Sequence, residues 1–244
     1  MQYLKKIGVR LFSAFVICAV IIYTIILGPA AIIISVFDRS GHCMHYLARY
    51  WSRLILFTAG VRVTVLGLEN LNPHKQYIIV ANHQSLLDIP VTFCYLPLQL
   101  RMLAKKELYW IPLFGWAIWM GGHIRLDRSS REQALKVLEK AAEQLRNRDI
   151  SVMMYPEGTR SSDGTVSKFK SGAFKLALSS GLPIVPVSIS GTRFVLPKKS
   201  LLIHPGKVAM VIGEAIPVGE KGSIQDVHIL RDKIRTIVVQ NLVN

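Results

Sequence analysis

An uncharged apolar segment near the N-terminus is the feature of this sequence that most constrains its fold. Between Arg10 and Asp38 lie 27 residues without a charge, rich in Ile, Val, Ala and Leu. As one helix this segment would be about 40 Å long, more than the ~30 Å that the hydrocarbon core of a bilayer requires. We therefore expect residues 11–37 to contact a membrane.

The sequence leaves open how this segment meets the membrane. Gly28-Pro29 is expected to interrupt it, leaving 17 residues before the break and 8 after it, and the second piece is too short to span a bilayer alone. A cleaved signal peptide would have an apolar core of only about 7–15 residues, so we expect a retained anchor. Because basic residues flank both ends, one span, a re-entrant helix and a helix in the membrane plane are all permitted. These residues are Lys5, Lys6, Arg10, Arg39, Arg49 and Arg53.

The net charge of +15, from 30 basic and 15 acidic residues, suits either nucleic acid or an acidic membrane surface. The apolar N-terminus favours the membrane. Much of the basic content is scattered rather than laid along one predicted helix, and no nucleic-acid-binding motif is recognisable. Membrane lipids are therefore expected partners and nucleic acid is not.

The cysteines indicate the compartment of the protein. Cys18, Cys43 and Cys94 lack the spacing of a disulfide framework, which favours reduced thiols facing the cytoplasm. The run His-Cys-Met-His at 42–45 looks like a metal cluster, but no partner group stands at zinc-site spacing. We expect an amphipathic helix surface there and no metal.

Beyond residue 60, apolar β-rich runs alternate with helical patterns, which favours an α/β fold with a mixed sheet covered by helices on both faces. We divide the chain into a membrane-anchoring helical region, residues 1–60, and an α/β domain, residues 61–244. The expected strands are 61–66, 76–81, 151–155, 184–189 and 207–212, and the expected helices are 42–59, 131–148, 172–180 and 223–242.

A histidine and an aspartate five positions apart form the first candidate site. His83 and Asp88 follow the apolar run 77–81, so they lie where loops build active sites. Inside one regular helix they would point about 140° apart, so one of them must precede the helix, with Asp88 at its start and Pro90 in its first turn. An aspartate beside a neutral imidazole fixes its tautomer and stabilises the imidazolium, which makes His83 a candidate general base.

Two further loops carry charged groups at probable strand ends. The segment 155–161, Tyr-Pro-Glu-Gly-Thr-Arg-Ser, holds Glu157 and Arg160 three positions apart, and we expect an oriented ion pair with bidentate anion recognition there. The segment 122–128 contributes Arg128. Taken singly, each of these groups also fits an ordinary turn or surface charge.

Together these segments resemble the membrane glycerolipid acyltransferases of the 1-acylglycerol-3-phosphate O-acyltransferase family. Four blocks occur in order: NHQSLLD at 82–88, GHIRLDR at 122–128, YPEGTRS at 155–161 and IVPV at 184–187. The segment AKKELYWIPLFG at 104–115 is also similar, and the resemblance covers about residues 60–215. Two departures are Tyr155, where the family often has Phe, and Arg125, where an apolar or aromatic residue is usual and which leaves local substrate contacts open.

The resemblance implies transfer of a fatty acyl group from acyl-CoA or acyl-carrier protein to the sn-2 hydroxyl of 1-acylglycerol-3-phosphate, giving phosphatidic acid. His83 would remove the hydroxyl proton and Asp88 would orient the ring. No metal or cofactor is needed. By analogy with the family, the acceptor would be positioned by Arg128, Glu157, Gly158, Thr159 and Arg160, with the arginines holding its phosphate. Lys105, Lys106 or a backbone amide near Gly158 would stabilise the oxyanion.

Other functions stay open at this point. The same base could serve a different lysolipid head group. A hydrolase would use Ser85 as nucleophile, and a non-catalytic membrane-binding protein would need neither His83 nor Glu157. We expect the protein at the membrane, on the cytoplasmic face of the inner cell membrane. The choice of donor, the preferred chain length and the oligomeric state are not predicted.

Overall fold

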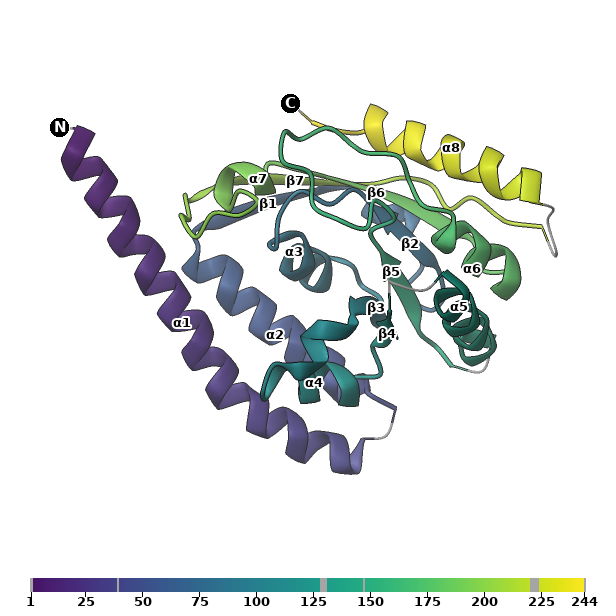
Figure 1. The fold of residues 1–244 in the computed structure, drawn as a ribbon, viewed down its shortest axis with the longest axis horizontal. Helices are drawn as coiled ribbons and strands as arrows, with labels where there is room; N and C mark the ends of the chain where they lie inside the picture. The colour runs from purple at the N-terminus through teal and green to yellow at the C-terminus, as the bar shows by residue number, and fades with distance from the viewer. Residues whose placement is uncertain (1, 39, 128–130, 147, 220–223, 244) are drawn as a thin grey trace.

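The computed structural model describes residues 2–38, 40–127, 131–146, 148–219 and 224–243 (Figure 1). Its described strands form one seven-stranded sheet in the order β1-β7-β6-β2-β5-β3-β4. The pairs are parallel except β6 with β7, which is antiparallel, so the predicted mixed sheet is confirmed. The strands are β1 Val61–Leu66, β2 Ile78–Ala81, β3 Leu100–Lys105, β4 Ile124–Leu126, β5 Ser151–Met154, β6 Ile184–Ser190 and β7 Gly206–Ile212.

Helices cover both faces of the sheet, as expected from the alternating pattern (Figure 1). They are α1 Gln2–Phe37, α2 His42–Thr58, α3 Asp88–Tyr95, α4 Phe114–Met120, α5 Arg131–Arg146, α6 Gly172–Ser180, α7 Thr192–Val195 and α8 Ile224–Gln240, with 3₁₀ turns η1 Leu68–Asn70 and η2 Lys106–Trp110. The cap predicted at Ser223 lies outside the described residues.

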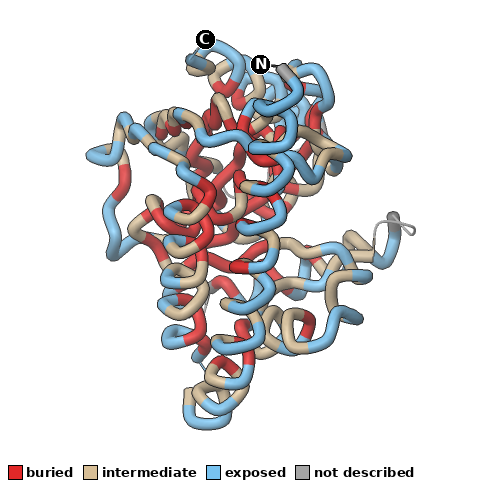
Figure 2. Tube along the Cα trace, turned by 90° about the vertical axis from the view of Figure 1, so that its left-hand side faces the viewer, coloured by how far each residue is buried: buried red, intermediate tan, exposed pale blue. Residues whose placement is uncertain are grey.

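The central strand β2 separates two hydrophobic cores. Successive side chains of a strand point to opposite faces. Ile79 and Ala81 pack with α2 and α3, whereas Ile78 and Val80 pack with α5, α6 and α8. All four residues are buried, as in a strand covered on both faces. Buried positions accordingly run through the middle of the molecule, with exposed positions along the outer helices (Figure 2).

The N-terminal helix α1 is continuous, so the expected interruption at Gly28-Pro29 was wrong. Proline removes one N–H from a helix, but packing on neighbouring helices can compensate for this loss in an apolar setting. Gly28 supplies such a contact, because a Cβ atom there would lie 3.2 Å from Cβ of Leu113, just before α4. By length and composition α1 is able to cross a membrane, and its most apolar stretch is mostly unburied.

Polar contacts join α1 to α2 as well. The Tyr23 hydroxyl lies 2.9 Å from Oγ1 of Thr58, and Nε1 of Trp51 donates to Oγ1 of Thr24 at 3.1 Å. Helix α2 in turn packs on α3 and β1. The two predicted regions therefore pack against each other. The division of the chain at residue 60 stays a prediction.

Strand β4 pairs with β3 only from Leu103 onward. Two histidine side chains accept hydrogen bonds from the part of β3 that precedes Leu103. Nδ1 of His45, in the predicted amphipathic segment of α2, accepts the N–H of Leu100 at 3.3 Å, and Nδ1 of His123 accepts that of Met102 at 3.0 Å. Burial lowers the pKa of His45 to about 3, with nearby Arg101 adding to the effect. His45 is therefore a neutral acceptor that attaches α2 to the sheet.

Candidate active site

The predicted site residues that the structure describes gather at the carboxyl ends of adjacent strands. His83 follows β2, and Tyr155 directly follows β5, which pairs with β2 in parallel. In open α/β sheets, ligands bind beyond this edge. Asp88 is the first residue of α3, so the loop between β2 and α3 carries His83 and leads directly into Asp88.

His83 and Asp88 meet as the bent connection predicts. Nδ1 of His83 lies 2.7 Å from Oδ2 of Asp88. The same Oδ2 accepts the backbone N–H groups of Gln84 at 2.7 Å and Ser85 at 2.9 Å. Because this oxygen already accepts two N–H groups, we assign the proton of the contact to Nδ1 of His83. Nε2 is then the unprotonated nitrogen of the ring.

Thr192 completes the environment of the Asp88 carboxylate. Its Oγ1 donates to Oδ1 of Asp88 at 2.6 Å, and both residues are fully buried. Thr192 begins α7, 104 positions after Asp88 in the chain. The sequence analysis missed this residue, because it stands outside the quoted blocks and only the fold brings it to the site. Its closest sequence signal is its place five positions after the run 184–187.

Glu157 holds the histidine loop through the backbone. Its Oε1 accepts the N–H of His83 at 2.7 Å, and its Oε2 accepts the N–H of Ser167 at 2.9 Å. Burial raises the pKa of Glu157, and these two hydrogen bonds oppose the rise. Ser161 also donates its N–H to the His83 carbonyl at 2.8 Å. The expected ion pair with Arg160 was wrong, because backbone N–H groups are what the Glu157 oxygens contact.

The ring of Tyr155 stacks on His83. The two ring centroids lie 4.3 Å apart with an angle of 22° between the planes. The Tyr155 hydroxyl lies 3.4 Å from Oγ1 of Thr92, and burial raises the pKa of Tyr155 well above its usual value. The aromatic ring limits the rotation of the imidazole, so Tyr155 acts on the histidine in the way that Phe at this position would.

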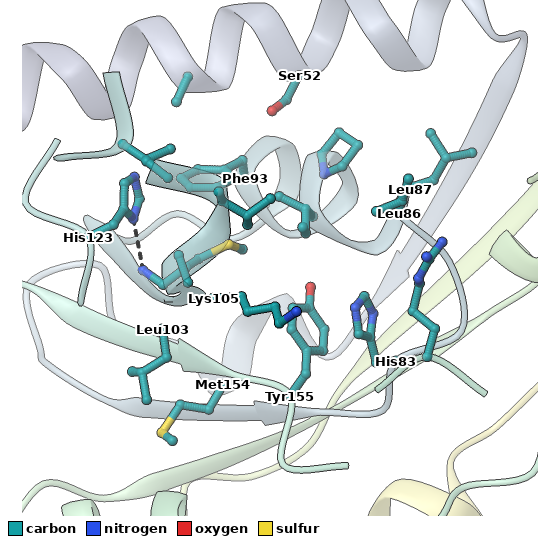
Figure 3. A pocket seen from close by; sticks show the side chains of 18 of the residues that line it. Ser52, His83, Leu86, Leu87, Phe93, Leu103, Lys105, His123, Met154 and Tyr155 are labelled. Atoms are coloured by element: carbon teal, nitrogen blue, oxygen red, sulfur yellow. Dashed lines mark hydrogen bonds between the residues drawn. The ribbon is translucent and has the colours of Figure 1, made fainter. Parts of the chain in front are cut away.

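The two lysines predicted for an oxyanion are placed differently. Lys105, at the end of β3, lines the same cavity as His83 and points toward Tyr155 (Figure 3). Its Nζ also lies 3.2 Å from a carboxylate oxygen of exposed Glu107. Lys106 instead pairs with Asp127 at 2.7 Å. The N–H of Gly158 donates to the Tyr155 carbonyl at 3.1 Å. Of these groups, Lys105 is the one positioned to reach a ligand.

Three of the residues predicted to hold an acceptor lie in the loop that follows β5. Gly158, Thr159 and Arg160 all line the cavity. Gly158 has a φ of 74°, and a Cβ there would lie 2.8 Å from Nζ of Lys170, so glycine allows that ammonium to rest against the loop. Lys170 also lines the cavity. Arg128 lies outside the described residues.

Ser85 is not placed as a nucleophile. Its side chain is fully buried, and its Oγ donates to the Leu196 carbonyl at 2.7 Å while accepting the N–H of Leu87 at 3.2 Å. A nucleophilic serine needs a hydroxyl within reach of a base and a substrate. The Ser85 hydroxyl instead stabilises the turn, which argues against a serine hydrolase.

A large apolar cavity of about 1440 Å³ extends from His83. Figure 3 shows Leu103 and Met154 on one side of it and Ser52 on the opposite side, with His83 and Tyr155 between them. Its walls come from α1 to α6, β3 and the segment after β5, with further contributions from α8. A base in the wall of such a cavity suits a ligand with a long apolar part and a reacting polar end.

Comparisons with known proteins show which sequences and structures this chain is similar to. Residues 62–190 match the family model described as Acyltransferase. The chain is 35% identical over 181 residues to human 1-acyl-sn-glycerol-3-phosphate acyltransferase alpha, covering 74% of this chain and 64% of the relative. For the enzyme of that description from Saccharomyces cerevisiae the identity is 33% over 216 residues, covering 87% of this chain and 70% of the relative. A relative from Chlamydomonas reinhardtii is 37% identical over 158 residues, which are 64% of this chain and 47% of its own length.

The structure is also similar to a solved one. The crystal structure of the 1-acyl-sn-glycerophosphate (LPA) acyltransferase PlsC from Thermotoga maritima superposes with a TM-score of 0.79 at 29% identity. The match covers 98% of this chain and 95% of that one. The sequence matches, in contrast, reach less than two thirds of the human relative's length and about half of the algal relative's.

Proposed function

Because this chain belongs to the acyltransferase family, we propose that it transfers a fatty acyl group from a thioester to the sn-2 hydroxyl of 1-acylglycerol-3-phosphate, giving phosphatidic acid. The observation that carries the proposal is the 2.7 Å contact between His83, which lines an apolar cavity, and Asp88. That contact supplies a base, and the cavity supplies room for a fatty chain.

In this mechanism Nε2 of His83 is the general base. A lipid hydroxyl holds its proton too tightly to attack a thioester unaided at neutral pH, so Nε2 takes the proton as the oxygen attacks. The Asp88 carboxylate stabilises the imidazolium that forms. The tetrahedral intermediate then expels a thiolate, which needs little help from an acid because thiols have a pKa of about 8.5. No covalent enzyme intermediate is required.

The other predicted site residues suit the rest of this reaction. We assign Arg128 and Arg160 to the acceptor phosphate, since a guanidinium binds phosphate in a bidentate manner. Gly158 and Thr159 would contact the acceptor from the same loop. We assign Lys105 to the oxyanion, because its side chain lines the cavity beside His83. We retain Glu157 at the site as the group that holds the His83 backbone.

The proposal includes a location at the cytoplasmic face of the inner cell membrane. The long apolar helix α1 supports contact with the bilayer, where both the lysolipid and the fatty product dissolve. The donor is acyl-CoA or acyl-carrier protein, both of which are soluble on the cytoplasmic side. Membrane lipids and the acceptor are accordingly the partners.

A second lysolipid remains the alternative substrate, because His83 would serve any acceptor hydroxyl equally well. The apolar cavity carries no information about the head group. The arginine assignments are what favour a phosphate, so an uncharged or zwitterionic acceptor would leave those guanidinium groups without a partner.

Purified protein in detergent tests the proposal with a matrix of donors and acceptors. We expect phosphatidic acid from 1-acylglycerol-3-phosphate, and a fall in kcat of about 10²–10⁴-fold in His83→Ala. His74→Ala, in an exposed turn, is the matched control and should keep full activity. Full activity in His83→Ala would refute the base assignment. Release of free fatty acid without an acceptor would instead indicate a hydrolase.

A further inference from the structure

The short helix α4 and the preceding turn η2 have two faces of different character. Phe114, Ala117 and Ile118 line the cavity, following the spacing of one helix face. Trp116 and Trp119 are three positions apart, so they are neighbours on a helix surface. They are 55% and 68% exposed and do not line the cavity. Helix α4 therefore has one face in the cavity wall and an opposite face that carries exposed tryptophans.

The turn η2 packs on α4 and carries further exposed apolar residues. Trp110, its last residue, is 76% exposed, and Ile111 beside it is 45% exposed. The guanidinium of Arg125, in β4, lies 5.8 Å from the ring centroid of Tyr109 and 6.0 Å from that of Trp110. Arg125 is the position where the resembling family usually has an apolar or aromatic residue. Here it places a positive charge among the aromatic rings.

The position of α4 in the fold indicates what covers this surface. Helix α4 packs directly on α1. Leu113, just before α4, lies against Gly28, and the Ser35 hydroxyl lies 3.0 Å from Sδ of Met120 at the end of α4. Exposed apolar side chains continue along this half of α1, at Ile33 and Phe37 among others. Any bilayer that covers this half of α1 therefore reaches α4 as well.

Tryptophan is the residue best suited to the boundary between lipid and water. Its ring is largely apolar and its indole N–H seeks a polar partner, so it concentrates at the level of the lipid head groups. An arginine among such rings adds attraction to acidic head groups, because a positive charge close to the surface meets the negative potential of acidic lipids.

We propose that Trp110, Trp116 and Trp119, together with Arg125, form a second membrane-contact surface that rests in the head-group region of a bilayer containing acidic lipids. This surface, the η2–α4 surface, makes α4 the partition between the bilayer and the cavity. The proposal concerns membrane contact and does not depend on acyl transfer.

Single-tryptophan proteins test it. Each keeps one of Trp110, Trp116 and Trp119, with the others and Trp51 replaced by Phe, and is mixed with phosphatidylcholine vesicles that contain one third phosphatidylglycerol. The lipid is brominated either high on the acyl chain or near its methyl end. We expect the shallow bromines to quench each emission by about half and the deep ones to quench it less, as at the head-group boundary. Emission should also shift to shorter wavelength.

A matched control reports the far side of the molecule. Val239→Trp, placed in a protein whose four native tryptophans are Phe, puts the reporter on the exposed side of α8. We expect no quenching there. Quenching of the three native positions no stronger than in this control, or vesicles that bind no protein, would overturn the proposal. The vesicles contain no lysolipid and no donor, so either result is independent of the proposed reaction.

The charge contribution of Arg125 is tested separately. Omitting phosphatidylglycerol, or raising the salt concentration, should weaken the quenching at Trp110 by about twofold, since both reduce attraction to acidic lipids. Arg125→Gln should reduce this dependence, whereas Arg125→Lys should retain it. A dependence that is the same in Arg125→Gln as in the unmodified chain would refute the role of Arg125.

Discussion

The two sides of the cavity are built on different principles. On the catalytic side, the Asp88 carboxylate has four hydrogen-bonded neighbours and the His83 backbone is held by Glu157. On the opposite side, α1, α2 and α4 present mainly apolar side chains, and the hydroxyl of Ser52 has no hydrogen-bond partner among the described residues. Hydrogen bonds fix positions to fractions of an ångström, whereas apolar walls fix only volume. Chemistry should depend on the first side and the size of the substrate on the second.

Removing the charge of Asp88 should have the largest effect. In Asp88→Asn the amide offers an N–H group where the network needs acceptors, so the imidazole loses its tautomer and the imidazolium its counter-charge. We expect kcat to fall about 10⁴-fold with little change in KM, measured as phosphatidic acid formed. Asp149→Asn, on an exposed loop, should have no effect. A decrease in kcat smaller than tenfold would show that the Asp88 carboxylate is dispensable.

Glu157→Gln should separate two roles for this residue. An amide can accept only one of the N–H groups of His83 and Ser167 well, so the histidine loop loosens. At about 1–3 kcal/mol for a buried donor left unpaired, kcat should fall by roughly 10–100-fold while KM for the acceptor stays constant. If Glu157 contacts the acceptor, as the family resemblance implies, KM for the acceptor rises instead. Exposed Glu214→Gln is the control.

Thr192→Val should have a smaller effect in the same direction. It removes a single hydrogen bond to Asp88 and keeps the shape of the side chain. We expect kcat to fall about tenfold, the equivalent of 1.4 kcal/mol at the lower end of a hydrogen bond to a charged group. Thr192→Ser should restore most of the activity. Equal kcat values in the valine and serine variants would mean that Thr192 does not position Asp88.

Substitution of Ser52 probes the other side of the cavity. Ser52→Leu adds volume to the wall, so we expect about a tenfold loss of kcat/KM with the longest acyl donors relative to shorter ones. Ser52→Ala should leave the chain-length preference unchanged and raise the free energy of unfolding by about 1 kcal/mol, because an unpaired hydroxyl is removed. If Ser52→Leu lowers kcat/KM equally for donors of all chain lengths, the acyl chain does not contact this wall.

Local patterns predicted the elements that flank the site. Five strands appear near their expected bounds, because runs of β-branched residues between turn residues favour strands. These strands lie at residues 61–66, 78–81, 151–154, 184–190 and 206–212. The helix 172–180 has its expected ends, and Gly181 stops it with a φ of 72°. His83 and Asp88 were predictable because their contact is made within one short loop.

Contacts set by topology were not predictable. Thr192 meets Asp88 only because β6 lies beside β2 in the sheet. Region 96–126 carries mixed apolar and basic residues without a clear period, so β3, η2 and α4 had no pattern to identify them. Glu157 illustrates the same limit, since a carboxylate near an arginine suggests an ion pair until the backbone N–H groups that reach it first are known.

The pairing of β1 has a consequence for the order in which the chain folds. Strand β1 follows α2 almost directly, yet among the described strands its partner is β7, and Val61 pairs with Gly206. At a synthesis rate of about 5–20 residues per second, α1 and α2 leave the ribosome some 7–30 seconds before that partner exists. The apolar helices thus meet a lipid surface or a chaperone first. The sheet is completed afterwards, when α1 and α2 are already bound to the lipid surface or the chaperone.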